Sequence, residues 1–378
     1  MKQICNECVM SFPEDPNVTF DGNGVCNYCT IFKEKPEIFG KHTPEKASEL
    51  WNKKLYEIKS LRENTQNWKY DCLIGASGGL DSSYLCYIAR KHDLKALLVN
   101  VDNSFNSDTA NRNLKIIKDK TGFDWYSPSM SFDEFRELQL AFLRASVIDT
   151  DLPSDYLIEA FIHILARKHK IKYIFSGGNY FADAFMPTAW NYPNKTDYTN
   201  IMNVYKKFGN SAKLKTLPKY GAFQVLQDKY LHKIKYVTPL NLVCYNRFEA
   251  LKTLQKEWKY EAYDDKHGEN IFTRFYQRYI LPVKFGVDKR IANYSNYIRS
   301  NGMTRNEALR LLRKSAYDYP VFENDKKFIL EKLGLSGKEF VDIMALPVRS
   351  HKESGSDDWL YKLEKKVRKT VKFIIRRT

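Results

Sequence analysis

The sequence predicts an α/β fold in which a parallel sheet is covered by helices on both faces. Short apolar runs alternate with helical patterns between about residues 69 and 176, as in parallel strands that are joined by helices. A glycine-rich turn, 77–82, lies between the first apolar run and the first helix of this region. Two Cys-x-x-Cys pairs precede the region, and a helical region, 261–378, follows it.

Residues 1–35 are predicted to form a zinc-binding knuckle unit. They hold two Cys-x-x-Cys pairs, whose members are Cys5, Cys8, Cys26 and Cys29. This spacing is typical of a structural zinc site, in which two tight turns each present two thiolates to one tetrahedral ion. The alternatives are two disulfides, which a reducing compartment disfavours, and four unrelated cysteines. The expected role of the zinc is to fold a segment that is too small to have its own core.

The predicted central domain, 36–260, begins with a helix over 43–66 that is capped by Thr43. The elements that follow are expected in this order: strand 71–75, helix 81–92, strand 96–101, helix 107–121, strand 123–127, helix 131–146, helix 154–169 capped by Ser154, and strand 172–176. The pattern is less regular over 184–260, and we expect a loop-rich insertion near 187–220. Ligands of parallel sheets bind at the carboxyl ends of the strands, so the loops there form the candidate site.

The turn Ser77-Gly78-Gly79-Leu80-Asp81-Ser82 carries the strongest functional signal. A strand, a glycine-rich turn and a helix N-terminus form an anion site, because free backbone N–H groups and the positive end of the helix dipole meet there. No lysine follows the glycines, which excludes a Walker A loop. The turn resembles the PP-loop, SGGxDS, of the ATP pyrophosphatases, a group of adenine nucleotide alpha hydrolase-like proteins. An ordinary strand–turn–helix with a serine cap is the alternative.

The resemblance to the PP-loop implies that the chain cleaves ATP between the α- and β-phosphates and releases pyrophosphate. The ATP-binding residues that it implies in the first loop are Ala76, Ser77, Gly78, Gly79, Asp81 and Ser82. Asp81 is also implied to be catalytic and to place Mg²⁺, a hard cation that prefers carboxylate and phosphate oxygens.

Two further loops are expected at the same edge of the sheet. Asp102 follows the second strand and is assigned to ATP binding. The loop 176–183 follows the fourth strand. In PP-loop enzymes a glycine-containing segment at this point, often ending in aspartate, faces the ATP. The resemblance therefore implies ATP binding by Gly177 and Asn179 and a catalytic role for Asp183. A polar turn in which Asp183 is solvated or caps a helix is the alternative.

Three acidic residues, Asp149, Asp151 and Asp155, cluster near the start of the predicted helix 154–169. Carboxylates at this position satisfy free backbone N–H groups and oppose the helix dipole. We therefore interpret the cluster as helix capping.

The segments 266–277 (KHGENIFTRFYQ), 281–290 (LPVKFGVDKR) and 301–309 (NGMTRNEAL) carry a second resemblance. Together with the cysteine pairs and the glycine-rich turn, they resemble the N-acetyl sugar amidotransferases of surface polysaccharide, O-antigen and sialic-acid-like sugar pathways, the group that contains WbpG and PseA. The resemblance extends from Cys5 to about Leu312. It implies binding of an N-acetylated sugar or nucleotide-sugar by residues of 261–378, for which the candidates are His267, Glu269, Arg274, Lys284, Lys289 and Arg290. A solvated basic face is the alternative for each of them.

The family is expected to convert an acetamido group into an acetamidino group. ATP adenylates the amide oxygen, ammonia adds to the carbon, and AMP leaves. The chain has no recognisable glutaminase domain, so the resemblance implies a HisH-like glutaminase subunit and a HisF-like partner that carries ammonia. The rival interpretations are a PP-loop enzyme that modifies tRNA, such as a thiolase or a lysidine synthetase, and a non-catalytic nucleic-acid scaffold. Thiolation usually needs paired cysteines, and Cys72, Cys86 and Cys244 give no obvious pair.

The formal net charge of +16 favours anionic partners, which include nucleotides, nucleotide-sugars, nucleic acid and an acidic membrane face, and it does not choose among them. The resemblance to the amidotransferases implies no nucleic-acid partner. The sequence has no 18-residue apolar run and no signal-peptide pattern at its start, so we expect a cytoplasmic protein. Residues 359–378 combine a basic composition with apolar residues at helical spacing. Such a helix either packs on the core or makes a weak contact with the inner membrane face.

Overall fold

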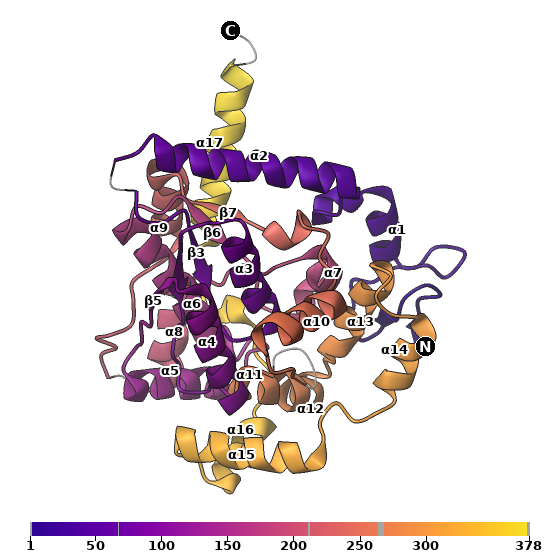
Figure 1. Ribbon diagram of the computed structural model, residues 1–378. Coiled ribbons are helices and arrows are strands. Elements are labelled where there is room, and N and C mark those ends of the chain that lie inside the picture. Colours follow the sequence, from indigo (N-terminus) through magenta and orange to yellow (C-terminus); the bar gives the residue numbers. More distant parts are fainter. Residues whose placement is uncertain (1, 67, 211, 264–267, 376–378) are drawn as a thin grey trace.

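The computed structural model describes residues 2–66, 68–210, 212–263 and 268–375. Its centre is a five-stranded parallel sheet with the strand order β5-β4-β3-β6-β7 (Figure 1). The strands are β3 (Cys72–Gly75), β4 (Ala96–Val99), β5 (Asp124–Tyr126), β6 (Tyr173–Phe175) and β7 (Lys235–Val237). The chain first builds one side of β3 and then crosses to the other side, so the order of strands reverses at β3. Open parallel sheets bind ligands at such a switch point.

Helices cover both faces of this sheet, which confirms the predicted fold class. They are α2 (Pro44–Glu63), α3 (Leu80–Lys91), α4 (Asp108–Thr121), α6 (Leu152–Lys168) and α10 (Arg247–Trp258). Helix α5 (Phe132–Ala145) packs against α6. Cys72 and Ile74 of β3 share a buried cluster with residues of α2, α3, α4 and α10. Leu73 belongs to a separate cluster with residues of α6. Successive residues of a strand point to opposite faces, so the continuous apolar run of β3 supports a helix layer on each side.

One sequence expectation for this region is wrong. Helix α6 begins at Leu152 rather than at 154, because Pro153 is tolerated in the first turn of a helix, where its missing N–H has no partner to lose. Ser154 is therefore inside the helix and is not its cap. The insertion near 187–220 contains one α-helix, α8 (Tyr198–Phe208), between longer loop segments.

The sequence patterns did not predict α9 (Ala222–Gln227) or β7, which follow the insertion. Strand β7 has only one buried residue, Val237, and therefore shows no apolar run that could mark it as a strand.

The N-terminal unit contains β1 (Gln3–Ile4), β2 (Ser11–Phe12) and α1 (Asn27–Glu34), and it packs on helices from the other end of the chain. Arg305 donates from Nε to the carbonyl oxygens of Cys5 and Cys8, at 3.0 and 3.1 Å. The Ser295 hydroxyl accepts a hydrogen bond from the Val9 N–H at 3.2 Å. These contacts tie the unit to the C-terminal helices.

The C-terminal region is helical, as predicted. Its helices are α11 (Ile271–Phe275), α12 (Leu281–Phe285), α13 (Lys289–Arg299), α14 (Arg305–Leu312), α15 (Tyr319–Leu333), α16 (Gly337–Ala345) and α17 (Asp358–Ile375). Helix α17 projects from the body of the molecule (Figure 1), and Trp359, Leu363 and Val367 are exposed on it. No described helix is long and apolar enough to span a membrane. Contact of α17 with a membrane surface stays a prediction.

The four cysteines of the N-terminal unit are buried and close enough together to hold a metal ion. Their sulfur atoms all lie within 4.8 Å of one another, with 3.6 Å between Cys8 and Cys26 and 4.0 Å between Cys5 and Cys29. Sulfur atoms bound to one tetrahedral zinc are separated by about 3.8 Å, so this set fits zinc. The guanidinium group of Arg299 lies 3.4 Å from the Cys29 sulfur and 3.5 Å from the Cys8 sulfur, where it stabilises thiolate charge.

We predict that Cys8→Ser abolishes binding of one zinc ion per chain and lowers the melting temperature by about 4 °C or more, because the N-terminal unit then loses its metal crosslink. Elemental analysis and thermal unfolding measure the two effects. Cys244→Ser is the matched control, since Cys244 is exposed and lies outside the cluster. Full zinc occupancy in Cys8→Ser would contradict the four-cysteine assignment.

Candidate active site

The glycine-rich turn, 77–82, connects β3 to α3 at the switch point of the sheet. Its two serine hydroxyls lie 3.2 Å apart, and the Gly79 N–H donates to Ser77 Oγ at 3.2 Å. Ser82 and Ser83 both donate to the Gly79 carbonyl, at 3.0 and 2.7 Å. Gly79 is the N-cap of α3 and gives it no side-chain cap, so the first N–H groups of the helix face the turn without a side-chain partner from that residue.

Gly78 requires the conformational freedom of glycine. Its φ of +79° lies in the left-handed region, and a Cβ there would come within 2.7 Å of the Ala110 carbonyl oxygen on α4. Its own carbonyl oxygen accepts hydrogen bonds from the hydroxyls of Tyr260 and Tyr263, each at 3.0 Å. The turn is therefore held in shape by α4 on one side and by the segment after α10 on the other.

A small pocket of about 240 Å³, which we call the turn pocket, lies directly over this turn. Its polar lining consists of Ser77, Asp81, Ser82, Asp183, Arg247, Tyr263 and Glu269. The Tyr245 hydroxyl donates to Asp81 Oδ1, and the Arg247 guanidinium lies 3.7 Å from the same oxygen. The turn pocket thus combines a helix N-terminus and a cation with three carboxylates, which is a suitable lining for a phosphate group with a divalent cation.

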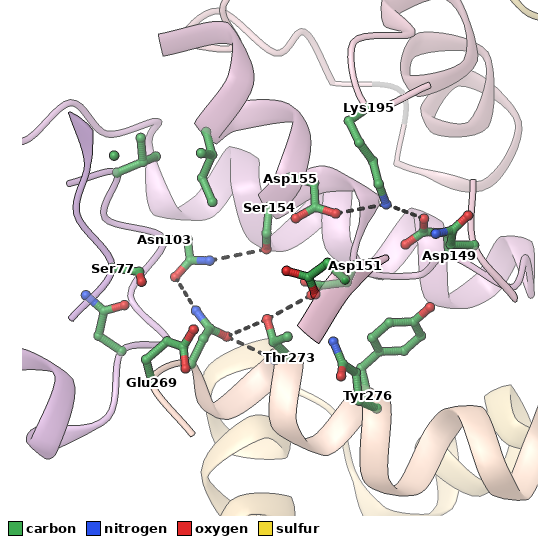
Figure 2. A pocket seen from close by; sticks show the side chains of 18 of the residues that line it. Ser77, Asn103, Asp149, Asp151, Ser154, Asp155, Lys195, Glu269, Thr273 and Tyr276 are labelled. Atoms are coloured by element: carbon green, nitrogen blue, oxygen red, sulfur yellow. Dashed lines mark hydrogen bonds and ion pairs between the residues drawn. The ribbon is translucent and has the colours of Figure 1, made fainter. Parts of the chain in front are cut away.

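A larger cavity of about 420 Å³, which we call the main cavity, adjoins the turn pocket and shares Ser77, Asp183 and Glu269 with it. Figure 2 shows Ser77 and Glu269 at one end of it and Asp149 and Lys195 at the other. The main cavity therefore extends from the glycine-rich turn towards the start of α6 and the insertion.

The far end of the main cavity is lined by the acidic cluster that the sequence assigned to helix capping. That assignment is wrong for Asp151, which occupies the N-cap position of α6 without a side-chain cap hydrogen bond, whereas Asp155 does lie in the first turn of the helix. Lys195 Nζ pairs with Asp149 at 2.6 Å and with Asp155 at 2.9 Å. Asp151 instead accepts a hydrogen bond from the Thr273 hydroxyl at 2.8 Å. The cluster is a functional-site candidate because its side chains bind Lys195 and Thr273 and line a cavity.

Burial and neighbouring charges shift the pKa values of Asp151, Asp149 and Lys289 in different directions. Burial, together with the charges of Asp155 and Asp149, raises the pKa of Asp151 to about 7. Burial opposes ionisation of Asp149 too, but Lys195 and Lys289 lower its pKa below the usual value. Burial lowers the pKa of Lys289, against the attraction of Asp149. A carboxyl group that titrates near neutral pH beside fixed ion pairs is typical of sites that transfer protons.

A chain of hydrogen bonds connects Asp151 to the loop after β4 (Figure 2). Asn103 donates to the Ser154 hydroxyl at 3.2 Å and accepts from Asn270 at 3.1 Å. The Thr273 hydroxyl, which donates to Asp151, lies 3.3 Å from Asn270 Oδ1. The network joins α6, the β4 loop and α11, so residues far apart in sequence hold the floor of the main cavity in place.

The structure brings most of the predicted ATP-binding residues together. Those that line the main cavity or the turn pocket are Ala76, Ser77, Gly79, Asp81, Ser82, Gly177 and Asp183. Gly78 lines neither space, but its positive φ gives the turn its shape. Asp102 and Asn179 line neither space: Asp102 accepts from the Ser104 N–H at 2.7 Å, and Asn179 caps α7 (Tyr180–Asp183) through the Ala182 N–H at 2.9 Å. Asn103, the next residue after Asp102, lines the main cavity instead.

The predicted sugar-binding residues fall into two groups, those that line the main cavity and those that have partners elsewhere. Glu269 and Lys289 line the main cavity. Arg274 forms two hydrogen bonds of 2.7 Å with Asp325, and Arg290 pairs with Asp288 at 2.7 Å. Lys284 donates to three carbonyl oxygens at the end of α16, those of Ile343, Met344 and Leu346. These three cations have structural partners outside the main cavity, and His267 lies outside the described residues.

Arg247 and Lys195 are site residues that the sequence did not indicate. Both come from the irregular stretch 184–260, where no motif marks a function. Asp151 was noticed but given the wrong role, because the sequence places it beside a helix and does not reveal the cavity.

We predict that Gly78→Ala lowers the free energy of unfolding by about 2 kcal/mol or more, since it adds both backbone strain and a clash with Ala110. Urea denaturation measures the change. Gly122→Ala is the matched control, because Gly122 also has a positive φ, +63°, but a Cβ there meets nothing within 4 Å. Equal losses in the two variants would mean that the contact with Ala110 does not constrain the turn.

Comparison with known proteins gives a partial identification of the chain. Residues 269–368 match the family model of WbpG-like LPS biosynthesis proteins, C-terminal domain. Comparison with curated proteins gives no match. Among solved structures, NMN synthetase from Francisella tularensis is 15% identical at a TM-score of 0.30, over 78% of this chain and 98% of that chain. NH3-dependent NAD synthetase from Campylobacter jejuni is 13% identical at a TM-score of 0.27, over 57% and 86% of the two chains. The family match confirms the predicted resemblance to WbpG-like proteins over residues 269–368.

Proposed function

We propose that the protein uses ATP, with release of AMP and pyrophosphate, to convert the acetamido group of a sugar or nucleotide-sugar into an acetamidino group. The observation that carries the proposal is the SGGLDS turn, which sits at a helix N-terminus and at the switch point of the sheet and opens into both cavities. The WbpG-like match of residues 269–368 supports a role in surface polysaccharide synthesis.

In this proposal the pyrophosphate part of ATP lies in the turn pocket. Backbone N–H groups of the glycine-rich turn and the Arg247 guanidinium bind its oxygens. Asp81, Asp183 and Glu269 are the carboxylates available to Mg²⁺, which would neutralise phosphate charge when bound. A Mg²⁺ ion typically takes one or two protein carboxylates together with substrate phosphates, which matches this lining.

The chemistry needs ATP because an amide oxygen is a poor leaving group. Attack of the acetamido oxygen on the α-phosphorus forms an O-adenylyl imidate and releases pyrophosphate. Ammonia then adds to the imidate carbon, and the bond from this carbon to the AMP oxygen breaks. Water has to be kept from the imidate, since it would return the amide. The main cavity is the space in this fold where acceptor and nitrogen source can meet beside the turn pocket.

The lining of the main cavity suits the polar sugar part of the acceptor. Several amide side chains, those of Asn103, Asn191, Asn270, Gln277 and Asn293, line it and offer both donors and acceptors to sugar hydroxyls. Of the described cationic residues that were predicted to bind the sugar, Lys289 is the one that lines the main cavity. We place the sugar here rather than near Arg274, Lys284 and Arg290, whose charges are already paired or bonded.

A tRNA-modifying enzyme that transfers sulfur is the alternative. The environments of Cys72 and Cys86 disfavour it. Cys72 and Cys86 are buried, and burial raises the pKa of both thiols, that of Cys86 to about 12. Neither lines the main cavity or the turn pocket. The thiolate is the reactive form of cysteine, so these two residues are poor sulfur carriers.

We predict that Asp81→Asn lowers the rate of AMP formation about 100-fold or more while thermal stability changes little, because the variant loses the carboxylate proposed to place Mg²⁺. The assay supplies ATP, ammonium chloride and a panel of UDP-N-acetyl sugars and N-acetylated sugar acids, and it measures AMP and pyrophosphate. Asp108→Asn is the matched control, since Asp108 is also in the first turn of a helix but is exposed. Near-normal turnover by Asp81→Asn would remove Asp81 from the proposed site.

We further propose that ammonia comes from a separate HisH-like glutaminase through a HisF-like partner. The purified chain should then form the acetamidino product with ammonium chloride and not with glutamine alone. Mass spectrometry of the sugar product in parallel reactions tests this. Equal product from glutamine and from ammonium would show that the chain needs no glutaminase partner.

A further inference from the structure

Asp151 differs from every other carboxylate at the far end of the main cavity. Asp149 and Asp155 are paired with Lys195, whereas Asp151 has no ion pair among the described residues. Its Oδ2 accepts from Thr273, and its Oδ1 is buried without any hydrogen-bond partner in the described part of the chain. The residue is only 5% exposed and lines the main cavity, and Figure 2 shows it beside Thr273 in the middle of the site. A buried carboxylate oxygen without a partner is costly unless a ligand completes it.

The charges around Asp151 indicate the sign of that ligand. The loop and first turn of α6 contribute Asp149, Asp151 and Asp155, the insertion contributes Lys195, and α13 contributes Lys289. Tyr276 is the neighbouring titratable group from the helical turn after α11, and burial raises its pKa well above the usual value, so it stays neutral. Three carboxylates thus face two amines, of which Lys195 is already bound to Asp149 and Asp155. The far end of the main cavity is complementary to one small cation.

Ammonium is the small cation that the proposed reaction consumes, and in its protonated form it has no lone pair with which to attack carbon. A base near the acceptor is therefore needed. We propose that Asp151 Oδ1 binds ammonium and takes one proton from it, so that neutral ammonia attacks the activated acetamido carbon. This inference rests on the proposed function.

This step requires no reactant other than ammonium, Asp151 and the imidate. One N–H bond of ammonium breaks as Asp151 becomes a neutral carboxylic acid. The freed lone pair forms the new C–N bond to the imidate carbon. One proton of the added nitrogen moves to the imidate nitrogen, and the C–O bond to AMP breaks with its electron pair on the phosphate oxygen. The product is an amidinium group, and Asp151 returns its proton to solvent. The pKa of about 7 that burial gives Asp151 suits a base at neutral pH.

The test compares Asp151→Asn with the wild type, using ammonium chloride and hydroxylamine as alternative nucleophiles. Hydroxylamine is largely unprotonated at neutral pH and needs no base. We expect Asp151→Asn to lose about 100-fold in rate with ammonium at pH 7 and to stay within about threefold with hydroxylamine. Its ammonium rate should rise about tenfold for each pH unit, as the fraction of free ammonia does, whereas the wild-type rate levels off above about pH 7. Equal losses with both nucleophiles would overturn the role as a base.

Asp228→Asn is the control for loss of a buried carboxylate, because Asp228 is also buried and one of its oxygens also has no hydrogen bond among the described residues, but it is ion-paired with Arg167 and does not line the main cavity. It should leave the ratio of ammonium to hydroxylamine rates unchanged. A change of that ratio as large as in Asp151→Asn would also overturn the proposal.

A binding experiment separates this inference from the proposed function. Crystals of the full chain are soaked in thallium(I) acetate, since thallium(I) is close to ammonium in size and gives an anomalous signal. We expect a peak at Asp151 in the wild type and none in Asp151→Asn. A peak at Asp151 with no turnover of any N-acetyl sugar would reject the proposed reaction but support the cation site. Absence of the peak in an enzyme that is active with ammonium would reject the ammonium site alone.

Discussion

The parallel pairing of β4 and β6 on opposite edges of β3 is the constraint on which the site depends. Three strands that run in the same direction place the loops after them at one edge of the sheet. The loops after β3 and β6 meet there so closely that a Cβ on Gly177 would lie 3.4 Å from the Asp81 Cβ. No single loop forms the turn pocket. The loops after β3 and β6 reach it because their strands are neighbours in the sheet, and Arg247, Tyr263 and Glu269 complete its lining.

The parts of the fold that could be predicted are those that depend on a few neighbouring residues. Apolar runs, helix caps and the glycine-rich turn act over a few residues, so β3, α3 and the turn could be placed from sequence, and Ser77, Asp81 and Ser82 with them. The four cysteines were also predictable, because tetrahedral metal sites impose their own spacing. Contacts between distant segments could not be predicted. The partner of Arg274 is Asp325, and the Lys195 that lies beside Asp155 belongs to a stretch without periodicity. A sequence shows that a side chain is charged but not which partner neutralises it.

The same limit explains why Asp149 and Asp151 were misinterpreted as helix caps. Carboxylates before a helix are most often caps, and that rule holds when the chain before the helix is exposed. Here α11, α13 and the insertion close over the start of α6, so burial replaces solvation as the dominant influence on these groups. Functional sites are where local rules and tertiary environment disagree, and this end of α6 is such a place.

In the proposed reaction, the two ends of the site bind different charges. The turn pocket offers backbone N–H groups and Arg247 to phosphate oxygens, and its carboxylates, Asp81, Asp183 and Glu269, are available to Mg²⁺. The start of α6 offers a carboxylate oxygen that has no hydrogen-bond partner among the described residues. Ammonium attracted to free phosphate oxygens would be held away from the acceptor carbon. In this proposal, Asp151 at the far end of the main cavity competes for ammonium and keeps it on the side of the acceptor opposite the phosphates. Phosphate binding in the turn pocket and cation binding at the far end would therefore keep the leaving group and the nucleophile apart.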